Sequence, residues 1–244
     1  MRYGTDTLLL IPCCAEKQPG GGDWDSDFPS IADTLGEAHN ILLSTRRELL
    51  LNLKGLPPYT NGKYAKNIDI LLGPDFGGDN VTGQYRPALE RYVGSLYKAG
   101  GNWSGQVKSA LLKPGAPGLL ILSALYGLLH PLELIQDYNL QMSDKPARTN
   151  WNEQLPLLLK AFVENTKAKR IVMYFGSSTA YLKVALRAVK PLLNIGSLKV
   201  LYYDVEKGNA YHTPHNHGLM LLQDLTDQEP TGYTRPVTLR RYVG

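Results

Sequence analysis

The chain has 244 residues, of which 43% are hydrophobic and 20% charged, and its formal net charge is +4. This is the composition of a globular protein that needs neither disulfides nor a metal to hold its core. No apolar run approaches the roughly 20 residues that span a bilayer, and the two adjacent cysteines cannot form a disulfide framework. We therefore expect a cytoplasmic protein that acts without a membrane and without a cofactor. The mild positive charge permits an anionic partner but does not demand nucleic acid.

The predicted elements alternate along the chain. Apolar runs predict strands at 8–11, 68–72, 119–122, 171–175 and 200–203, with a sixth at 219–222. Helical spacing of apolar residues predicts helices at 31–54, 86–97, 105–112, 151–166 and 178–189. Asn150 is the expected cap of the fourth helix, with Glu153 completing a capping box. Strands separated by helices predict one α/β domain over residues 1–244, with a mainly parallel mixed sheet and helices on both faces.

The carboxyl ends of the predicted strands carry most of the polar candidates. Right-handed crossovers bring these ends to one edge of a parallel sheet, so residues far apart in sequence should converge there. The residues that follow the strands are Cys13, Cys14, Glu16, Lys17, Asp75, Ser123, Tyr126, Gly176, Ser177, Ser178, Asp204, Glu206 and Lys207.

The stretch from residue 119 to residue 142 organises the chain. Its apolar run ends at Ser123, and Tyr126 and Gly127 then turn the backbone. Polar side chains follow within seven residues, among them Glu133 and Asp137. Polar groups just past the carboxyl end of a buried strand are where open α/β sheets place their sites. The alternative is a well-packed turn whose tyrosines are only half exposed.

The same stretch, SALYGLLHPLELIQDYNLQM, resembles the signature of the YaaA family, S-G-L-Y-G-L-L-R-P followed by D-L-x-x-P-Y-x-L-x-M. Tyr92, Gly94 and Tyr97 match its F-x-G-x-x-Y segment, and Lys17 falls at the lysine of its S-P-A-K segment. His130 replaces the signature arginine, which weakens an anion contact there. Further departures are Ala124, Glu133 and Asp137. The chain resembles a shortened relative with a different N-terminal half.

The resemblance implies protection against oxidative stress and DNA binding in a positively charged cleft. By the same resemblance, Lys17 would contact phosphate, Tyr126 and Tyr138 would contact a base or sugar, and Asp137 would be a polar anchor. From the residues alone, Cys14 beside Lys17 could be a nucleophile, because a nearby cation lowers a thiol pKa. Cysteines that only pack at a strand end, or that form a strained vicinal disulfide, are the alternatives.

Three weaker patterns leave alternatives open. Residues 176–179, Gly-Ser-Ser-Thr, follow a strand and open a helix, which favours a bound phosphate or carboxylate, or else a simple helix cap. His212, His215 and His217 have the donors of a metal site, but Pro214 lies between them and a solvated loop is favoured, so no metal is predicted. The arginines and tyrosines of residues 233–244 suit nucleic acid or a final edge strand.

The alternative function is an enzyme that acts on a nucleoside or nucleotide, of the N-glycosidase or base-exchange type, and hence a hydrolase or transferase of glycosidic bonds. A third possibility is a small-molecule binding module without chemistry. A closed cavity with a carboxylate at its floor favours the enzyme, whereas an open basic groove favours DNA. The candidate catalytic residues are Asp137, Glu133, Lys17 and Cys14. The candidate ligand-binding residues are Cys13, Tyr97, Ser123, Tyr126, Gly127, Tyr138, Gly176, Ser177 and Ser178. The sequence does not determine the oligomeric state.

Overall fold

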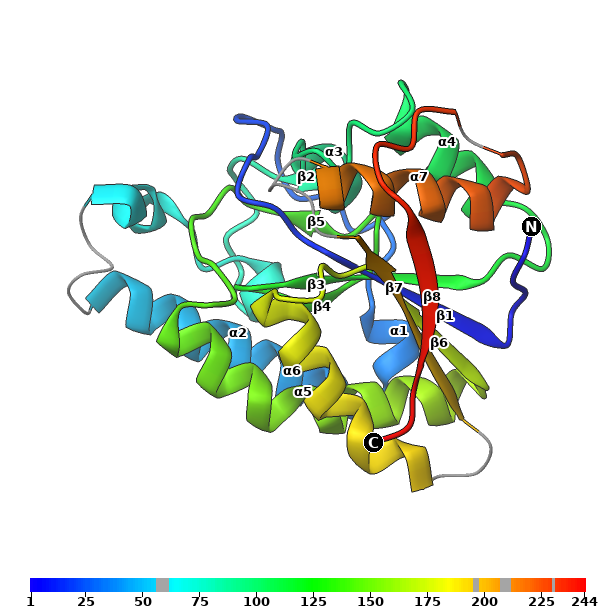
Figure 1. Ribbon diagram of the computed structural model, residues 1–244. Helices are drawn as coiled ribbons and strands as arrows, with labels where there is room; N and C mark the ends of the chain where they lie inside the picture. The colour runs from blue at the N-terminus through cyan, green and yellow to red at the C-terminus, as the bar shows by residue number, and fades with distance from the viewer. Residues whose placement is uncertain (56–61, 195–197, 207–211, 230) are drawn as a thin grey trace.

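The computed structural model describes residues 1–55, 62–194, 198–206, 212–229 and 231–244. Over these residues the main sheet has six strands in the order β4-β3-β1-β6-β7-β8 (Figure 1). Its four central strands are parallel: β1 (Thr7–Pro12), β3 (Gly118–Ser123), β6 (Arg170–Met173) and β7 (Lys199–Val205). The two antiparallel edges are β4 (Gly127–Leu129) and β8 (Val237–Tyr242). The predicted α/β fold with a mainly parallel mixed sheet is confirmed.

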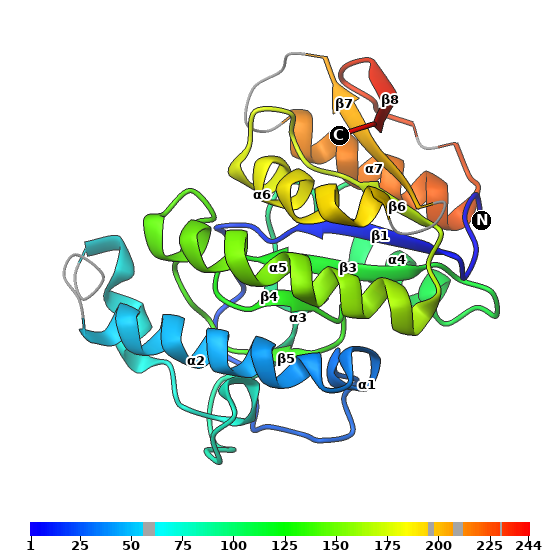
Figure 2. The same cartoon turned by 90° about the horizontal axis from the view of Figure 1, so that it is seen from below.

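Helices cover both faces of this sheet. The helices α2 (Ala38–Gly55), α5 (Lys145–Thr166) and α6 (Ala180–Val189) lie side by side on one face, and Figure 2 shows them in front of the strands. On the other face α4 (Trp103–Leu111) packs against α7 (His212–Thr226). Because both faces are covered, the central strands are mainly apolar, and Leu8–Ile11 of β1 are almost fully buried. The buried residues form one continuous core.

Shorter elements complete the described chain. They are α1 (Ala32–Leu35), α3 (Ala88–Arg91), the 3-10 helices η1 (Gly62–Asp69), η2 (Pro74–Phe76) and η3 (Lys190–Asn194), and a two-stranded sheet of β2 (Arg86–Pro87) and β5 (Leu134–Ile135). The expected helix at 31–54 is thus two helices, separated at Gly36, where the backbone has a φ of 55°. The segment 86–97 is helical only in α3.

Two predicted strands are wrong. Residues 68–72 are the end of η1 and an irregular segment, because side chains satisfy the backbone there. The Gln136 side chain accepts from Leu71 N at 2.8 Å and donates to Leu71 O at 2.9 Å, taking the place of a neighbouring strand. Residues 219–222 lie within α7, whose apolar run is buried. A short apolar run fits a buried helix as well as a strand, and here the helix is correct.

The start of the fourth predicted helix is also wrong. Helix α5 begins at Lys145, with Asp144 at the N-cap position and a proline in its first turn. Asn150 lies inside the helix, where its side chain donates to Pro146 O at 3.0 Å. Proline in the first turn costs no hydrogen bond, so the helix extends through residues that looked like a loop. In contrast, α4 and α6 lie close to their predicted positions.

Candidate functional site

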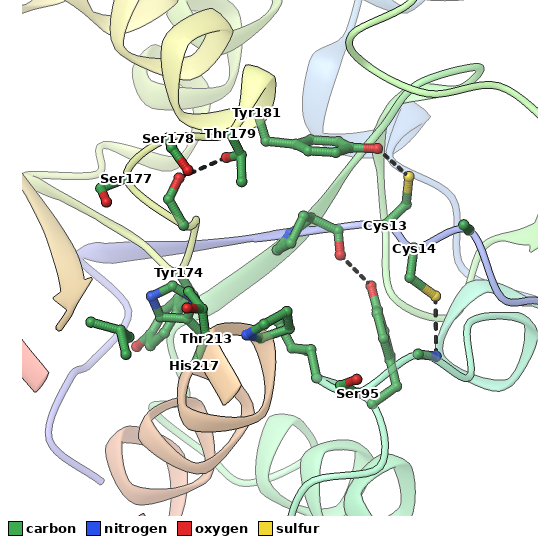
Figure 3. A pocket seen from close by; sticks show the side chains of 18 of the residues that line it. Cys13, Cys14, Ser95, Tyr174, Ser177, Ser178, Thr179, Tyr181, Thr213 and His217 are labelled. Atoms are coloured by element: carbon green, nitrogen blue, oxygen red, sulfur yellow. Dashed lines mark hydrogen bonds between the residues drawn. The ribbon is translucent and has the colours of Figure 1, made fainter. Parts of the chain in front are cut away.

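A cavity of about 810 Å³ opens at the carboxyl edge of the parallel strands (Figure 3). It is lined by the residues that follow β1, β6 and β7, by the segment 94–97, and by the first turns of α6 and α7. The chain leaves β1 toward β3 on one side, and leaves β6 toward β7 on the other side. Between two such strands an open α/β sheet has a crevice where ligands bind. We call this the switch-point cavity.

The structure brings together many of the predicted strand-end residues. Cys13, Cys14 and Tyr97 line the cavity from β1 and the segment 94–97. Gly176, Ser177 and Ser178 line it from β6. Glu16, Asp204 and Glu206 also lie in its wall. Lys207, which was expected beside them, lies outside the described residues.

The loop 176–179 leads into α6 at the cavity wall. Thr179 is the N-cap residue: its hydroxyl donates to Gly176 O at 2.7 Å and accepts from Leu182 N at 3.3 Å. Ser177 and Ser178 are exposed beside it. The cap interpretation therefore holds for Thr179, while the two serine hydroxyls lie at the positive end of the helix dipole.

The two cysteines are free thiols in separate surroundings. The Cys13 sulfur lies 2.9 Å from Tyr181 Oη (Figure 3). Cys14 Sγ accepts from Gly94 N at 3.2 Å and donates to Glu16 O at 2.9 Å. Burial raises the pKa of the Cys14 thiol to about 12, so the thiol is protonated and weakly nucleophilic at neutral pH.

Gly94 is required for this arrangement. A Cβ atom at this position would lie 2.8 Å from the Cys14 Cβ, closer than two carbon atoms can pack. The glycine of the aromatic segment therefore lets residues 92–97 approach the end of β1. Tyr97 secures the approach, since its hydroxyl donates to Pro12 O at 2.8 Å.

Lys17 lies behind the cavity wall. Its ammonium donates to Cys14 O at 3.0 Å and lies 4.0 Å from the centroid of the Tyr138 ring. Burial lowers the pKa of this lysine. Asp137, also predicted to act in the site, accepts from Lys66 at 2.8 Å. Neither Lys17 nor Asp137 lines the cavity.

The signature tyrosines are buried. Tyr138 Oη lies 2.8 Å from Ser123 Oγ and 3.0 Å from Tyr92 Oη. Tyr126 donates to Asp75 Oδ2 at 2.8 Å, and burial raises the pKa of Asp75 to about 7. All five of these residues are at most 2% exposed. Ser123, Tyr126 and Tyr138 thus form a polar network inside the core.

Glu133 and Gly127 also make their contacts inside the protein. Glu133 Oε1 accepts from Arg46 at 2.8 Å, and its other oxygen accepts from Ile31 N and His130 N at 3.2 and 3.1 Å. Gly127 turns the chain with a φ of 65° against the Trp151 ring. The carboxylate binds the protein's own backbone and guanidinium, and both residues lie away from the cavity lining.

The sequence did not single out four cavity residues: Ser95, Tyr174, Tyr181 and Thr213. Tyr181 could have been found, because it lies in the first turn of the helix that the 176–179 loop opens. Tyr174 directly follows β6, but its apolar neighbours made it look like strand.

The histidines lie in the first turns of α7 and not in the predicted loop. His217 is buried at the cavity wall, where Nε2 lies 3.0 Å from Tyr203 O. Burial lowers the pKa of His217 to about 4, which keeps the ring neutral. Within the described ranges, no group of three or more histidine, cysteine or acidic side chains is placed to hold a metal.

The tail forms β8, the edge strand that was the alternative to a nucleic-acid contact. Arg240 there donates to Asp204 Oδ2 at 2.7 Å.

These features define an open α/β protein with a ligand-sized cavity at its switch point. Residues 29–213 match the family model of the peroxide stress protein YaaA. The chain belongs to this family, as its signature implied. None of the helices over the described residues is long and apolar enough to cross a membrane.

Several relatives carry the name UPF0246. One from Idiomarina loihiensis is 26% identical over 244 aligned residues, which cover 87% of this chain and 88% of the relative. One from Burkholderia multivorans is 31% identical, over 41% of this chain and 42% of the relative. One from Paraburkholderia xenovorans is 28% identical, over 60% of this chain and 57% of the relative. The matched region thus spans about half the length of the last two relatives.

Proposed function

We propose that this YaaA-family protein binds a nucleoside or nucleotide in the switch-point cavity. The proposal is supported by the arrangement of the unit β6–α6–β7. Its first loop, residues 176–179, and the carboxylates at the end of its second strand lie in the wall of one cavity. This is the order of parts with which doubly wound sheets bind a phosphate and a ribose.

The phosphate would lie at the start of α6. This helix has ten residues, and its first turn faces the cavity with Thr179 as cap. Backbone N–H groups and the helix dipole favour an anion there. The exposed hydroxyls of Ser177 and Ser178 add donors that the helix does not use as its cap.

The sugar would lie toward the end of β7. Asp204 is the sixth residue of β7, and Glu206 follows its last residue. A carboxylate at this position in a strand–helix–strand unit accepts hydrogen bonds from ribose hydroxyls. Arg240 already contacts Asp204, so Glu206, which is exposed, is the better placed of the two.

The charges of the cavity favour a small molecule over DNA. The charged side chains among its described lining residues are those of Glu16, Asp204 and Glu206, without a lysine or arginine. A polyanion is bound chiefly by lysines and arginines on its phosphates, which this wall does not supply. The volume of about 810 Å³ also lies within the range of small-molecule sites. The DNA binding implied by the family resemblance therefore has less support than the binding of a nucleotide.

We extend the proposal to protection against peroxide in a reducing cytoplasm. The family match supports the first part, and the two free thiols support the second. Deletion of the gene should lower survival after a hydrogen peroxide challenge. Unchanged survival would count against the stress role without affecting the binding proposal.

Calorimetric titration with AMP, GMP, CMP, UMP, their nucleosides and a duplex oligonucleotide tests the proposal. We expect at least one nucleotide to bind, and Glu206→Gln to weaken its binding about tenfold, the cost of a lost charged hydrogen bond. Glu229→Gln is the matched control, because Glu229 is exposed outside the cavity lining. Tight binding of the duplex that falls steeply with salt, without binding of any nucleotide, would overturn the proposal.

A second candidate is an enzyme that cleaves a glycosidic bond of the bound nucleotide. It is supported by the carboxylates of Glu16 and Glu206 in the cavity wall, which could stabilise an oxocarbenium-like centre. The previously suggested carboxylates, Glu133 and Asp137, contact Arg46 and Lys66 elsewhere. Chromatography after incubation with the bound nucleotide should then reveal free base, and Glu206→Gln should abolish its release. A nucleotide recovered intact would exclude this candidate and leave binding alone.

A further inference from the structure

A buried chain of hydroxyls and one thiol connects the switch-point cavity with the family signature. From the cavity inward, Tyr181 Oη lies 2.9 Å from Cys13 Sγ, which lies 3.3 Å from Tyr138 Oη. Tyr138 Oη is 2.8 Å from Ser123 Oγ and 3.0 Å from Tyr92 Oη. Each of these five groups carries a single proton, so each can donate one hydrogen bond.

The contacts at the inner end of this hydrogen-bonded series determine which groups donate and which accept. Tyr138 donates its proton to Cys13 Sγ. Its contacts with Ser123 and Tyr92 must then be ones in which it accepts. Ser123 Oγ already accepts from Tyr126 N at 2.9 Å, which leaves its own proton for Tyr138. Both inner hydroxyls therefore donate outward.

The last contact, between Cys13 and Tyr181, lies at the cavity wall. Because the Cys13 sulfur accepts from Tyr138, the thiol has its own proton to donate, and its other partner is Tyr181. Burial raises the pKa of Tyr92, Tyr138 and Tyr181, so all three phenols keep their protons at neutral pH. The geometry allows either group to donate in this contact; in the order inferred here the thiol donates, so the Tyr181 oxygen accepts and retains its own O–H.

We infer that Tyr181 presents a fixed hydrogen-bond donor to the switch-point cavity, and that the bound molecule places an acceptor atom over the carboxyl end of β1. Tyr181 lines the cavity, and Figure 3 shows its ring extending from the start of α6 toward Cys13. Phe175 stacks on this ring with centroids 6.2 Å apart, which holds the hydroxyl in place. The ligand half of this inference rests on the proposed nucleotide function.

The acceptor would belong to the base or the sugar. The proposed phosphate position lies beside residues 177–179 at the start of α6, whereas the Tyr181 hydroxyl lies at Cys13, directly after β1. A carbonyl oxygen, ring nitrogen or sugar oxygen would satisfy the donor. A molecule that offers an N–H at this place would leave two donors facing each other, and such mismatches are strongly rejected. Cys13 is a positioning residue, because it acts on the ligand through Tyr181.

Infrared spectroscopy of the thiol tests the proton order without any ligand. In a Cys14→Ser background, the S–H stretch reports Cys13 alone. We expect Tyr181→Phe to shift this band to higher frequency, because the thiol loses its acceptor. Tyr242→Phe, a change on β8, should leave the band in place. If Tyr181→Phe leaves the band unshifted, the thiol does not donate to Tyr181 and the inferred order is wrong.

Binding of whichever of AMP, GMP, CMP and UMP binds the wild-type protein most tightly tests the ligand half. Tyr181→Phe should weaken this binding about ten- to a hundredfold, the range for a buried donor removed from its acceptor. Cys13→Ser, which can still donate to Tyr181, should bind more tightly than Cys13→Ala. Circular dichroism confirms that each variant is folded.

The outcomes separate the two proposals. Binding of a nucleotide by the wild-type protein and by Tyr181→Phe with equal affinity would overturn the donor role and leave the nucleotide function standing. A wild-type protein that binds none of the four nucleotides would overturn the nucleotide function and the ligand half of the inference. The infrared band would still decide the order of the protons.

Discussion

The family signature and the switch-point cavity use similar residues in opposite ways. In the signature, Glu133, Tyr126 and Tyr138 direct their polar atoms at other protein groups, and all are buried. In the cavity, Ser177 and Glu206 lie exposed in the wall. The first region is a scaffold whose hydrogen bonds are satisfied within the protein, and the second offers hydrogen bonds to a ligand.

The comparison shows that the most recognisable stretch of a sequence need not contain its binding surface. The signature residues contact buried groups from other parts of the chain: Glu133 pairs with Arg46, and Tyr126 donates to the Asp75 carboxyl. The cavity wall comes from short segments after three different strands, none of which forms an extended motif. Changes in the scaffold should therefore cost stability, and changes in the wall should cost binding.

The largest expected effect is on the buried ion pair. Arg46→Ala should lower the free energy of unfolding by about 3–5 kcal/mol, because it leaves the Glu133 carboxylate buried without its cation. Arg46 also donates to Tyr126 O and Leu128 O at 2.8 Å each, and these contacts would be lost too. Urea unfolding measures the change. Arg47→Ala, at the exposed neighbour, should cost little, and equal losses for both variants would contradict the scaffold role.

A smaller loss is expected at the signature turn. Gly127→Ala should destabilise the protein by about 2–4 kcal/mol, since it combines a strained positive φ with a Cβ 2.4 Å from the Trp151 ring. Gly115→Ala is the matched control, because Gly115 has a φ of 80° but no atom within 4 Å of the added Cβ. The difference between their thermal transitions isolates the steric part. A control as unstable as Gly127→Ala would leave the tight packing at Trp151 without support.

The buried carboxyl predicts a pH dependence. The pKa of Asp75 is about 7 in the folded protein against an ordinary value of 3.8, so the folded state keeps a proton that the unfolded state has released. Folding thus takes up a proton in this window, and stability falls as pH rises through it and levels off above about pH 7. Between about pH 5 and 7, wild type should lose about 2 kcal/mol more than Asp75→Asn. Parallel stability curves for the two proteins would refute the raised pKa.

The smallest expected loss of stability is at the cavity wall. Thr179→Ala should cost about 1 kcal/mol, because it removes the cap of α6 at the cavity wall. Ser177→Ala, two residues earlier and exposed, should stay within about 0.5 kcal/mol of wild type. Guanidinium unfolding compares them. Should Ser177→Ala prove the more damaging, its hydroxyl would belong to the scaffold and not to the proposed ligand surface.

Some of the site followed from sequence order alone. The apolar runs at 8–11, 119–122, 171–175 and 200–203 predicted the parallel core, and this core placed Cys13, Cys14 and Gly176–Ser178 at one edge. That prediction succeeded because the carboxyl ends of parallel strands meet whatever the details of side-chain packing.

The roles of Lys17, Glu133 and Asp137 could not be predicted in the same way. Each is a charged residue near a strand end, but a partner that holds its side chain comes from elsewhere in the fold. Lys17 lies over the ring of Tyr138, in addition to its local contact with Cys14 O. Glu133 meets Arg46, 87 residues away in the chain, and Asp137 meets Lys66, 71 residues away. No local sequence pattern predicts such distant partners. The histidines were misjudged for a related reason, since Pro214 lies in the first turn of α7, where proline is tolerated.

The sequence by itself determined the α/β class, the family and the edge of the sheet at which a site should form. These depend on the spacing of apolar residues and on a local signature, both of which are written along the chain. Only the tertiary structure decided which polar residues face the cavity and which face the core. The reason is physical: whether a side chain is free to bind a ligand depends on the partners that surround it in space, and distant segments of the chain supply those partners.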